Sequence, residues 1–265
     1  MSAHAPTALP AQARAWRARK NVENLSAQQL ATLREAFGAV EAIGDDRGFG
    51  HWAGIHGLPL PMYCQHGTRL FLPWHRAYLY FFELALRDQV PEAMLAWWDW
   101  TSASSHLQGI PAAFADRRAS GQPNPLFSTT VPPVARINGR PRVTTRSPGP
   151  PGALPTPRDV QQVLALPDFL DFQSQLEDIH GAVHVWAGGT MRQIPWAAYD
   201  PIFWAHHTMI DRLWRLWQIR HPNPVFPPGW LNQALPPFPM TVADTLDIKA
   251  LGYRYASATT HAVVR

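Results

Sequence analysis

Twelve histidines distinguish this 265-residue chain, because histidine is the side chain that most often binds a metal ion near neutral pH. Two of them, His180 and His184, are four residues apart. On a helix this spacing puts both rings on one face, where they can bind the same ion. The residue after His180 is Gly181, so the glutamate that serves as general base in His-Glu-x-x-His zinc proteases is absent. The pair therefore predicts metal binding without indicating hydrolysis.

A second pair, His206 and His207, is adjacent in the chain, so only one of the two rings can face the helix that carries His180. His207 shares an apolar helical stripe with Phe203, which we expect to pack beside the ligands. We therefore predict His207 as the third ligand and His206 as a packed neighbour. Asp211 follows one turn after His207 and is expected to accept a hydrogen bond from its free ring nitrogen.

The first half of the chain offers a second set of imidazoles. His66 and His75 are nine positions apart, which suits one ligand on a loop and one at the start of a helix. His51 and His56 compete for the third place, and we favour His56 because Gly57 gives the backbone freedom near the site. Three imidazoles in each half suit copper, or less exclusively zinc, and argue against magnesium and calcium.

Four stretches with helical spacing of apolar residues must position these side chains. The first begins at a capping Ser26 and ends at Gly44, and the second runs from Pro73 to about Val90. The third covers residues 167–184. The fourth starts at Asp200, a favoured N-cap, followed by Pro201. These four helices predict a mainly α fold, a four-helix bundle with long irregular Pro-rich loops.

Composition limits the class of protein further. With 46% hydrophobic and 16% charged residues the chain can bury a substantial core, and a net charge of +4 without a dense basic run argues against nucleic acid as a partner. Residues 121–157 are rich in proline and carry four arginines without an acidic residue, which predicts an irregular surface connection or, alternatively, an anion-binding rim. Those arginines are Arg136, Arg140, Arg142 and Arg146.

Eight tryptophans next to the histidine motifs are assigned to a dry wall of the core. They are Trp74, Trp97, Trp98, Trp100, Trp186, Trp204, Trp214 and Trp217. The N-terminal segment lacks the apolar region of a secretory signal, and no apolar run is long enough for a membrane span. These observations make the cytoplasm the expected location, without a membrane, although export with a partner stays open.

Four motifs together resemble the tyrosinase, catechol oxidase and hemocyanin family of type 3 binuclear copper proteins. They are CQHGTRLFLPWHRAYLYFFE, WWDW, HGAVHVWAGG and DPIFWAHHTMIDRLW, and the resemblance extends from RKNV near Arg19 to GYRY near Tyr255. It implies two copper ions and a single catalytic domain over residues 1–265. By position in the motifs, His56, His66 and His75 match the ligands of the first copper, and His180, His184 and His207 those of the second.

The resemblance also implies roles for residues around the ligands. Cys64 in Cys-x-His matches the cysteine that a thioether bond joins to the histidine, here His66, although a small buried thiol would fit the pattern too. Glu177 matches the glutamate that holds the water taking the proton of a phenol, with a solvated helix carboxylate as the alternative. Val185 and Ile194 are placed at an open entrance, or else are ordinary packing residues.

Gly181 departs from the family pattern. Tyrosinases often carry an asparagine directly after the first ligand of the second copper, where this chain has Gly181. The departure puts efficient hydroxylation of monophenols in doubt and leaves the oxidation of diphenols untouched, because a monophenol with a pKa near 10 must first lose its proton.

The function implied is that of a copper-dependent polyphenol oxidase, of the catechol oxidase or tyrosinase type, which converts o-diphenols to o-quinones with dioxygen. Ortho-hydroxylation of monophenols, o-aminophenol oxidation and a hemocyanin-like dioxygen carrier are the alternatives, with a zinc hydrolase from another class. The enzyme is preferred because the chain ends about ten residues after Tyr255, which leaves no evident C-terminal domain to shield the site. Expected partners are a phenolic small molecule and dioxygen, with room for a helper protein that delivers copper.

Overall fold

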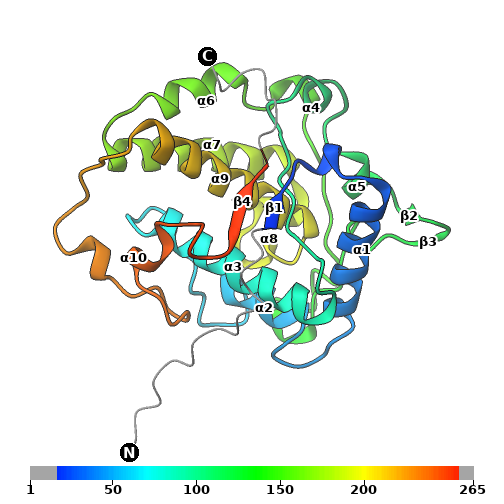
Figure 1. Ribbon diagram of the computed structural model, residues 1–265. Helices are drawn as coiled ribbons and strands as arrows, with labels where there is room; N and C mark the ends of the chain where they lie inside the picture. The colour runs from blue at the N-terminus through cyan, green and yellow to red at the C-terminus, as the bar shows by residue number, and fades with distance from the viewer. Residues whose placement is uncertain (1–16, 257–265) are drawn as a thin grey trace, which may run out of the picture.

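Helices dominate the computed structural model, which describes residues 17–256 (Figure 1). The three long helices are α3 (Phe71–Gln89), α7 (Phe169–Ala187) and α9 (Pro201–Arg220). They pack on one another, and α7 and α9 run beside each other above α3 in Figure 1. The short helix α2 (Phe49–His56) completes the group, and α1 (Ala27–Glu41) packs against α2 and α3. The predicted mainly α bundle is confirmed.

The predicted helix starts follow from local capping. Ser26 and Gln29 form a reciprocal capping box at the start of α1, and Asp200 accepts the backbone N–H of Ile202 ahead of Pro201 at the start of α9. Helix α3 begins at Phe71, two residues before the predicted Pro73. Proline is tolerated there because the N–H groups of the first turn have no acceptor within the helix.

Helix α2 was not predicted, although it carries one of the expected ligands. It is eight residues long and contains Gly50 and Gly54, and its N-cap residue Gly48 has no side chain to cap the helix. Each of these features weakens the helical signal in the sequence, so this helix is stabilised by its packing against α1 and α8. Because His56 is its last residue, one expected ligand lies on a helix that the sequence did not predict.

The remaining elements are short connections around the bundle. The helices are α4 (Ala103–Gln108), α5 (Ala112–Ala115), α6 (Pro157–Leu164), α8 (Ile194–Ala197) and α10 (Val242–Thr245), with 3-10 turns η2 (Val22–Asn24), η3 (Pro133–Ala135), η4 (Pro151–Ala153), η5 (Gly189–Arg192) and η6 (Trp230–Asn232). Strand β1 (Arg17–Arg19) pairs in parallel with β4 (Tyr253–Tyr255), and β2 (Arg118–Ala119) pairs antiparallel with β3 (Gln122–Pro123). The described chain therefore starts and ends in the same small sheet (Figure 1).

A buried set of charges connects this sheet to the long helices. Asp211 of α9 accepts from Arg76 of α3, with 2.5 Å between Oδ1 and Nε, and from Arg19 of β1, with 3.2 Å between Oδ2 and Nη1. Tyr253 and Tyr255 of β4 both donate their hydroxyl groups to Asp211 Oδ2. Both arginines have completely buried side chains. One carboxylate thus holds α3, α9 and both strands together.

The Pro-rich segment 121–157 is irregular as predicted, but both the solvated surface position and the anion-binding role are wrong for Arg146. This guanidinium forms an ion pair with Asp200, with 2.5 Å between Nη2 and Oδ1, and donates to the carbonyls of Phe114 and Leu126. The N-cap of α9 therefore also anchors the loop. Arg136 donates to the carbonyl of Val131 within the segment.

The predicted tryptophan wall is confirmed, since none of the eight side chains is more than 7% exposed. In residues 17–256 no helix is long and apolar enough to cross a membrane. The N-terminal segment interpreted as lacking a signal, and the chain beyond residue 256, lie outside the described residues.

Replacing Asp211 by asparagine should lower the free energy of unfolding by about 3–5 kcal/mol, because the buried guanidinium of Arg76 loses its charge partner and that of Arg19 keeps only Glu83. Burial alone would raise the pKa of Asp211, but Arg76 and Arg19 outweigh burial and lower this pKa. The stabilisation is therefore complete above the unfolded-state pKa of about 4 and is lost as the pH falls below it. Urea unfolding at several pH values measures both effects.

Asp45→Asn provides the matched control, since Asp45 pairs with Arg47 on the surface. An exposed pair contributes little to stability. If both substitutions changed the unfolding midpoint equally, the buried network would not have the stabilising role assigned to it.

Candidate metal centre

The six predicted histidines meet in one buried hollow between α2, α3, α7 and α9. Ligand atoms within 4.8 Å of one another form three overlapping groups. The groups are His180, His184, His206 and His207; His56, His75 and His207; and His56, Cys64 and His66. Residues more than 100 positions apart thus converge on a single site, as the spacing argument required.

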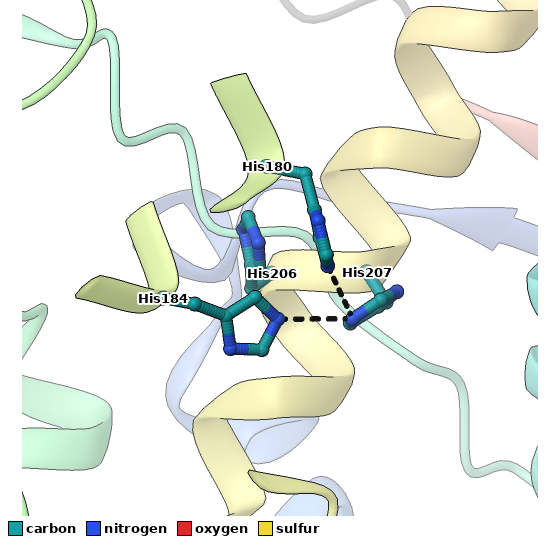
Figure 2. A group of neighbouring side chains, drawn as sticks. All are labelled: His180, His184, His206 and His207. Carbon is teal, nitrogen blue, oxygen red and sulfur yellow. Dashed lines mark hydrogen bonds between the residues drawn. The ribbon is translucent and has the colours of Figure 1, made fainter. Parts of the chain in front are cut away.

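The second triplet combines two helices. Figure 2 shows His180 and His184 on α7 facing His207 on α9. The Nε2 atom of His207 lies 3.2 Å from Nε2 of His180 and 3.3 Å from Nε2 of His184. Three ring nitrogens this close together are arranged to share one positive ion.

The first triplet combines a helix end, a loop and a second helix. His56 ends α2, His66 follows an extended loop, and His75 lies in the first turns of α3. Ring centroids are 5.1 Å apart for His56 and His66 and 5.2 Å for His66 and His75. His75 stacks on His207 at 4.5 Å, so the two triplets face each other. The competitor His51 is exposed.

Gly57 is needed beside this triplet for a reason other than backbone freedom. A Cβ atom at Gly57 would lie 2.2 Å from the carbonyl oxygen of Pro195 in α8, whereas the φ of Gly57 is an ordinary −115°. The glycine therefore permits close approach of α8 to the end of α2, which brings the segment after α7 to the metal centre.

Backbone carbonyls orient two of the rings. The Nδ1 atom of His75 lies 2.7 Å from the carbonyl oxygen of Phe71, and Nδ1 of His184 lies 2.7 Å from that of Met191. If these nitrogens donate, the Nε2 atoms keep their lone pairs and point into the hollow. Sequence reasoning missed both acceptors, although the i−4 carbonyl of a helical His75 was available as a signal.

The expected hydrogen bond from His207 to Asp211 is wrong. The carboxylate of Asp211 is engaged by Arg76, Arg19 and the two tyrosines of β4, and Nδ1 of His207 has no hydrogen-bond partner in the described residues. One helical turn separates the two residues as predicted, but two buried arginines compete for the carboxylate more strongly than a neutral ring does.

The rings are held in the neutral form that binds metals. Burial lowers the pKa of His66 to about 4 and that of His184 to about 4. Burial and then the neighbouring histidines lower the pKa values of His180 and His207 as well. No proton therefore has to be displaced from these rings when metal binds at neutral pH.

Unpartnered nitrogens test whether the hollow fits a metal. In residues 17–256, Nε2 of His56 and Nε2 of His75 are buried without a hydrogen-bond partner. Buried polar atoms nearly always have a hydrogen-bond partner. These nitrogens therefore indicate a site for a partner that accepts their lone pairs, such as a metal ion. A donor set made of imidazole nitrogens fits copper or zinc and not magnesium or calcium.

His206 and Phe203 enclose the ligands. His206 is buried and stacks on His180 with 5.2 Å between ring centroids and 10° between the planes. The ring of Phe203 lies 4.1 Å from that of His207 and 4.8 Å from that of His56. His206 belongs to the group of possible donors, but no hydrogen bond joins its ring to the other three in Figure 2.

A cavity of about 270 Å³ opens onto the histidines from outside. Its lining includes His56, His66, Glu177, His180, Gly181, His184, Val185, Met191, Arg192, Ile194 and Ala197. Val185 and Ile194 are 54% and 47% exposed at its mouth. Oε1 of Glu177 accepts the backbone N–H of Gly67 at 2.7 Å, and burial raises the pKa of Glu177. A Cβ at Gly181 would meet open space.

Cys64 lies beside the loop ligand. Its sulfur belongs to the same group of close atoms as the nitrogens of His56 and His66, and the residue is partly buried. Burial raises the pKa of the thiol to about 11, so an unmodified Cys64 is protonated at neutral pH.

Comparison with protein families matches residues 46–220 to the common central domain of tyrosinase. Over 222 residues the chain is 32% identical to hemocyanin units G and H of Sepia officinalis, a match that covers 76% of this chain and 37% of that protein. A tyrosinase of Streptomyces lincolnensis is 34% identical over 186 residues, covering 62% of this chain and 68% of that enzyme. The chain thus spans only a minor part of the hemocyanin.

Solved structures show the same fold. A functional unit of octopus hemocyanin superposes with a TM-score of 0.81 at 28% identity, covering 93% of this chain and 70% of the other. Tyrosinase from Burkholderia thailandensis gives a TM-score of 0.80 at 23% identity, covering 93% of this chain and 74% of the other.

Exchanging His207 for phenylalanine should remove at least one of two bound metal ions, because the Nε2 atom that joins two neighbouring donors is lost. Phenylalanine keeps the ring volume, so the core stays filled. Metal content per chain after loading and desalting measures the effect. His206→Phe is the matched control and should retain both ions; equal losses in the two variants would contradict the choice of His207.

Proposed function

Because the chain belongs to the tyrosinase family, whose members bind two copper ions, we propose that it is an oxidase that converts o-diphenols to o-quinones with dioxygen. The observation that carries this proposal is the cavity of about 270 Å³. It is lined by ligands from both triplets and has partly exposed Val185 and Ile194 at its mouth. A substrate the size of one aromatic ring therefore has a route to the metal centre.

We assign one copper to His56, His66 and His75 and the other to His180, His184 and His207. Two copper ions held in this way would supply the redox couple that passes two electrons from each of two diphenols to one dioxygen, giving two quinones and two waters. The protein contributes orientation, since the carbonyls of Phe71 and Met191 fix two rings. It also contributes a dry environment, because Phe203 and the buried tryptophans exclude water behind the ligands.

Glu177 is the group proposed to take a proton. Its Oε1 atom is held by the N–H of Gly67, which leaves Oε2 to accept a proton from a phenol or from an intervening water. A carboxylate near the ligands is useful for monophenols, which bind metal only after deprotonation. Diphenol oxidation depends less on Glu177 than monophenol hydroxylation does. We therefore propose diphenol oxidation as the main activity.

The thioether between Cys64 and His66 is also proposed. The proximity of the sulfur to the ring supports it, and the loop position of His66 gives it a physical purpose. A covalent bond would restrict the rotamers of a ligand that no helix holds. It would do so without consuming a metal-binding position.

A hemocyanin-like dioxygen carrier is the second candidate function. The similarity to Sepia officinalis and octopus hemocyanins supports it, and the same six histidines would serve it. The oxidation of o-aminophenols is chemically close to that of o-diphenols and is a variant of the first proposal. What separates carrier from oxidase is whether a phenol reaches the copper ions.

Oxygen uptake by the copper-loaded protein with 4-methylcatechol, p-cresol and o-aminophenol tests the proposal. We expect oxygen consumption and quinone absorbance with 4-methylcatechol and little of either with p-cresol. His207→Phe, prepared in the same way, controls for free copper. Reversible oxygen binding without quinone would support the carrier instead, and one zinc ion per chain would contradict both copper functions.

Gly181→Asn should raise the rate with p-cresol relative to 4-methylcatechol by about tenfold or more, since an amide beside Glu177 would help to hold the water that takes the proton. The open space at Gly181 accommodates the new side chain, and removing a helical glycine does not weaken α7. Gly181→Ala fills part of the space without an amide and should leave the ratio unchanged. An equal effect of both substitutions would indicate that packing, not water binding, matters here.

A further inference from the structure

Arg192 occupies a distinctive position at the mouth of the cavity. It is the last residue of η5, its side chain is exposed, and it lines the cavity together with Ile194. Among the lining residues it is the one cation, and Glu177 is the one carboxylate. Its guanidinium group offers several N–H donors in a fixed planar arrangement.

The guanidinium of Arg192 is available for a ligand. In residues 17–256 no carboxylate lies within ion-pair distance of it, and no hydrogen bond of its side chain is present. The neighbouring carboxylate of Glu177 is engaged by the N–H of Gly67 instead. The two opposite charges of the cavity therefore remain separate.

The backbone that carries Arg192 is fixed. The preceding residue, Met191, accepts from Nδ1 of His184, and Thr190 donates its N–H to the carbonyl of Thr145 at 2.8 Å. A Cβ at Gly189 would lie 2.1 Å from the same carbonyl oxygen, so the two backbones are in direct contact. The position of Arg192 relative to the ligand His184 is thus determined by the structure.

None of the four arginines of the Pro-rich segment lines this cavity. Arg146 is paired with Asp200 and nearly buried, and Arg136 donates to the carbonyl of Val131. Thr145, in the same segment, instead supports η5 and so helps to place Arg192 at the cavity.

We propose that Arg192 selects substrates that carry a carboxylate on the side of the ring opposite the reacting hydroxyl groups. A single-ring catechol with its hydroxyl groups toward the histidines directs its para substituent toward the mouth. A carboxylate there meets a forked donor that matches its geometry. This inference rests on the proposed oxidase function and names its substrate class as phenolic acids.

The test compares three catechols that differ in the charge of the para substituent. They are 3-(3,4-dihydroxyphenyl)propionate, 4-methylcatechol and dopamine, which are anionic, neutral and cationic at pH 7. Arg192→Gln should raise KM for the anionic catechol by roughly two- to fivefold, the range of an exposed charge pair, and leave KM for 4-methylcatechol unchanged. KM for dopamine should fall. Arg192→Lys should restore part of the preference.

Salt provides an independent readout. The preference for the anionic catechol should decrease between about 0.01 M and 1 M salt, because screening shortens the range of the attraction. Arg158→Gln removes an equal charge from the exposed face of α6, away from the cavity, and should not change any of the KM values. If Arg192→Gln changed the KM values for all three catechols alike, or for none of them, the inference would be overturned.

Binding without turnover separates this inference from the proposed function. Calorimetric titration of the cuprous, reduced protein under nitrogen measures the affinity for the anionic catechol, because neither the metal nor dioxygen can then oxidise it. If no catechol is oxidised but Arg192→Gln still weakens anaerobic binding of the anion, substrate selection stands and the oxidase proposal fails. If catechols are oxidised but the wild type shows no preference for the anion, the oxidase stands and the role of Arg192 fails.

Discussion

Seven imidazole rings share one interior region, and each can remain there only if it is neutral and its nitrogens find partners. Burial disfavours the imidazolium form, and neighbouring rings would repel a second proton, so the group behaves as a set of lone-pair donors. Backbone carbonyls occupy one nitrogen each of His75 and His184, while Nε2 atoms of other rings stay unpartnered. A pair of metal ions would give the unpartnered nitrogens a partner for their lone pairs. Much of the surrounding structure serves to keep the rings close enough to share these ions.

The relative position of α3 and α9 determines how closely the two triplets face each other, because His75 and His207 stack across that contact. The same two helices are joined a short way along by Arg76 and Asp211. Since this ion pair is buried and shared with β1 and β4, its geometry is strongly constrained. A carboxylate that touches no ligand thus contributes to the separation of the two sites.

The Pro-rich segment has an analogous role on the other side of the centre. Its Thr145 contacts η5, whose Met191 orients His184, while Arg146 ties the segment to the cap of α9. A connection with little secondary structure of its own is therefore held by polar contacts to the elements that bear ligands. The contact explains how an irregular loop can be part of the support of a metal centre.

Much of this protein was determined by local rules. Ser26 and Asp200 cap their helices as short-range hydrogen bonding requires, and the i, i+4 spacing of His180 and His184 places both rings on one face. Choosing His207 over His206 followed from the apolar stripe. Such features depend on residues within one or two turns, so the sequence alone predicts them.

Tertiary structure decided what local patterns could not contain. Helix α2 forms because neighbours cover it, and Gly57 is required by a carbonyl of Pro195 that is more than 130 positions away in the chain. Asp211 lies one turn from His207, yet two distant arginines engage its carboxylate. Which donor meets which acceptor depends on the distances of the packed chain and on competition between partners, and neither is encoded in the spacing of residues along one helix.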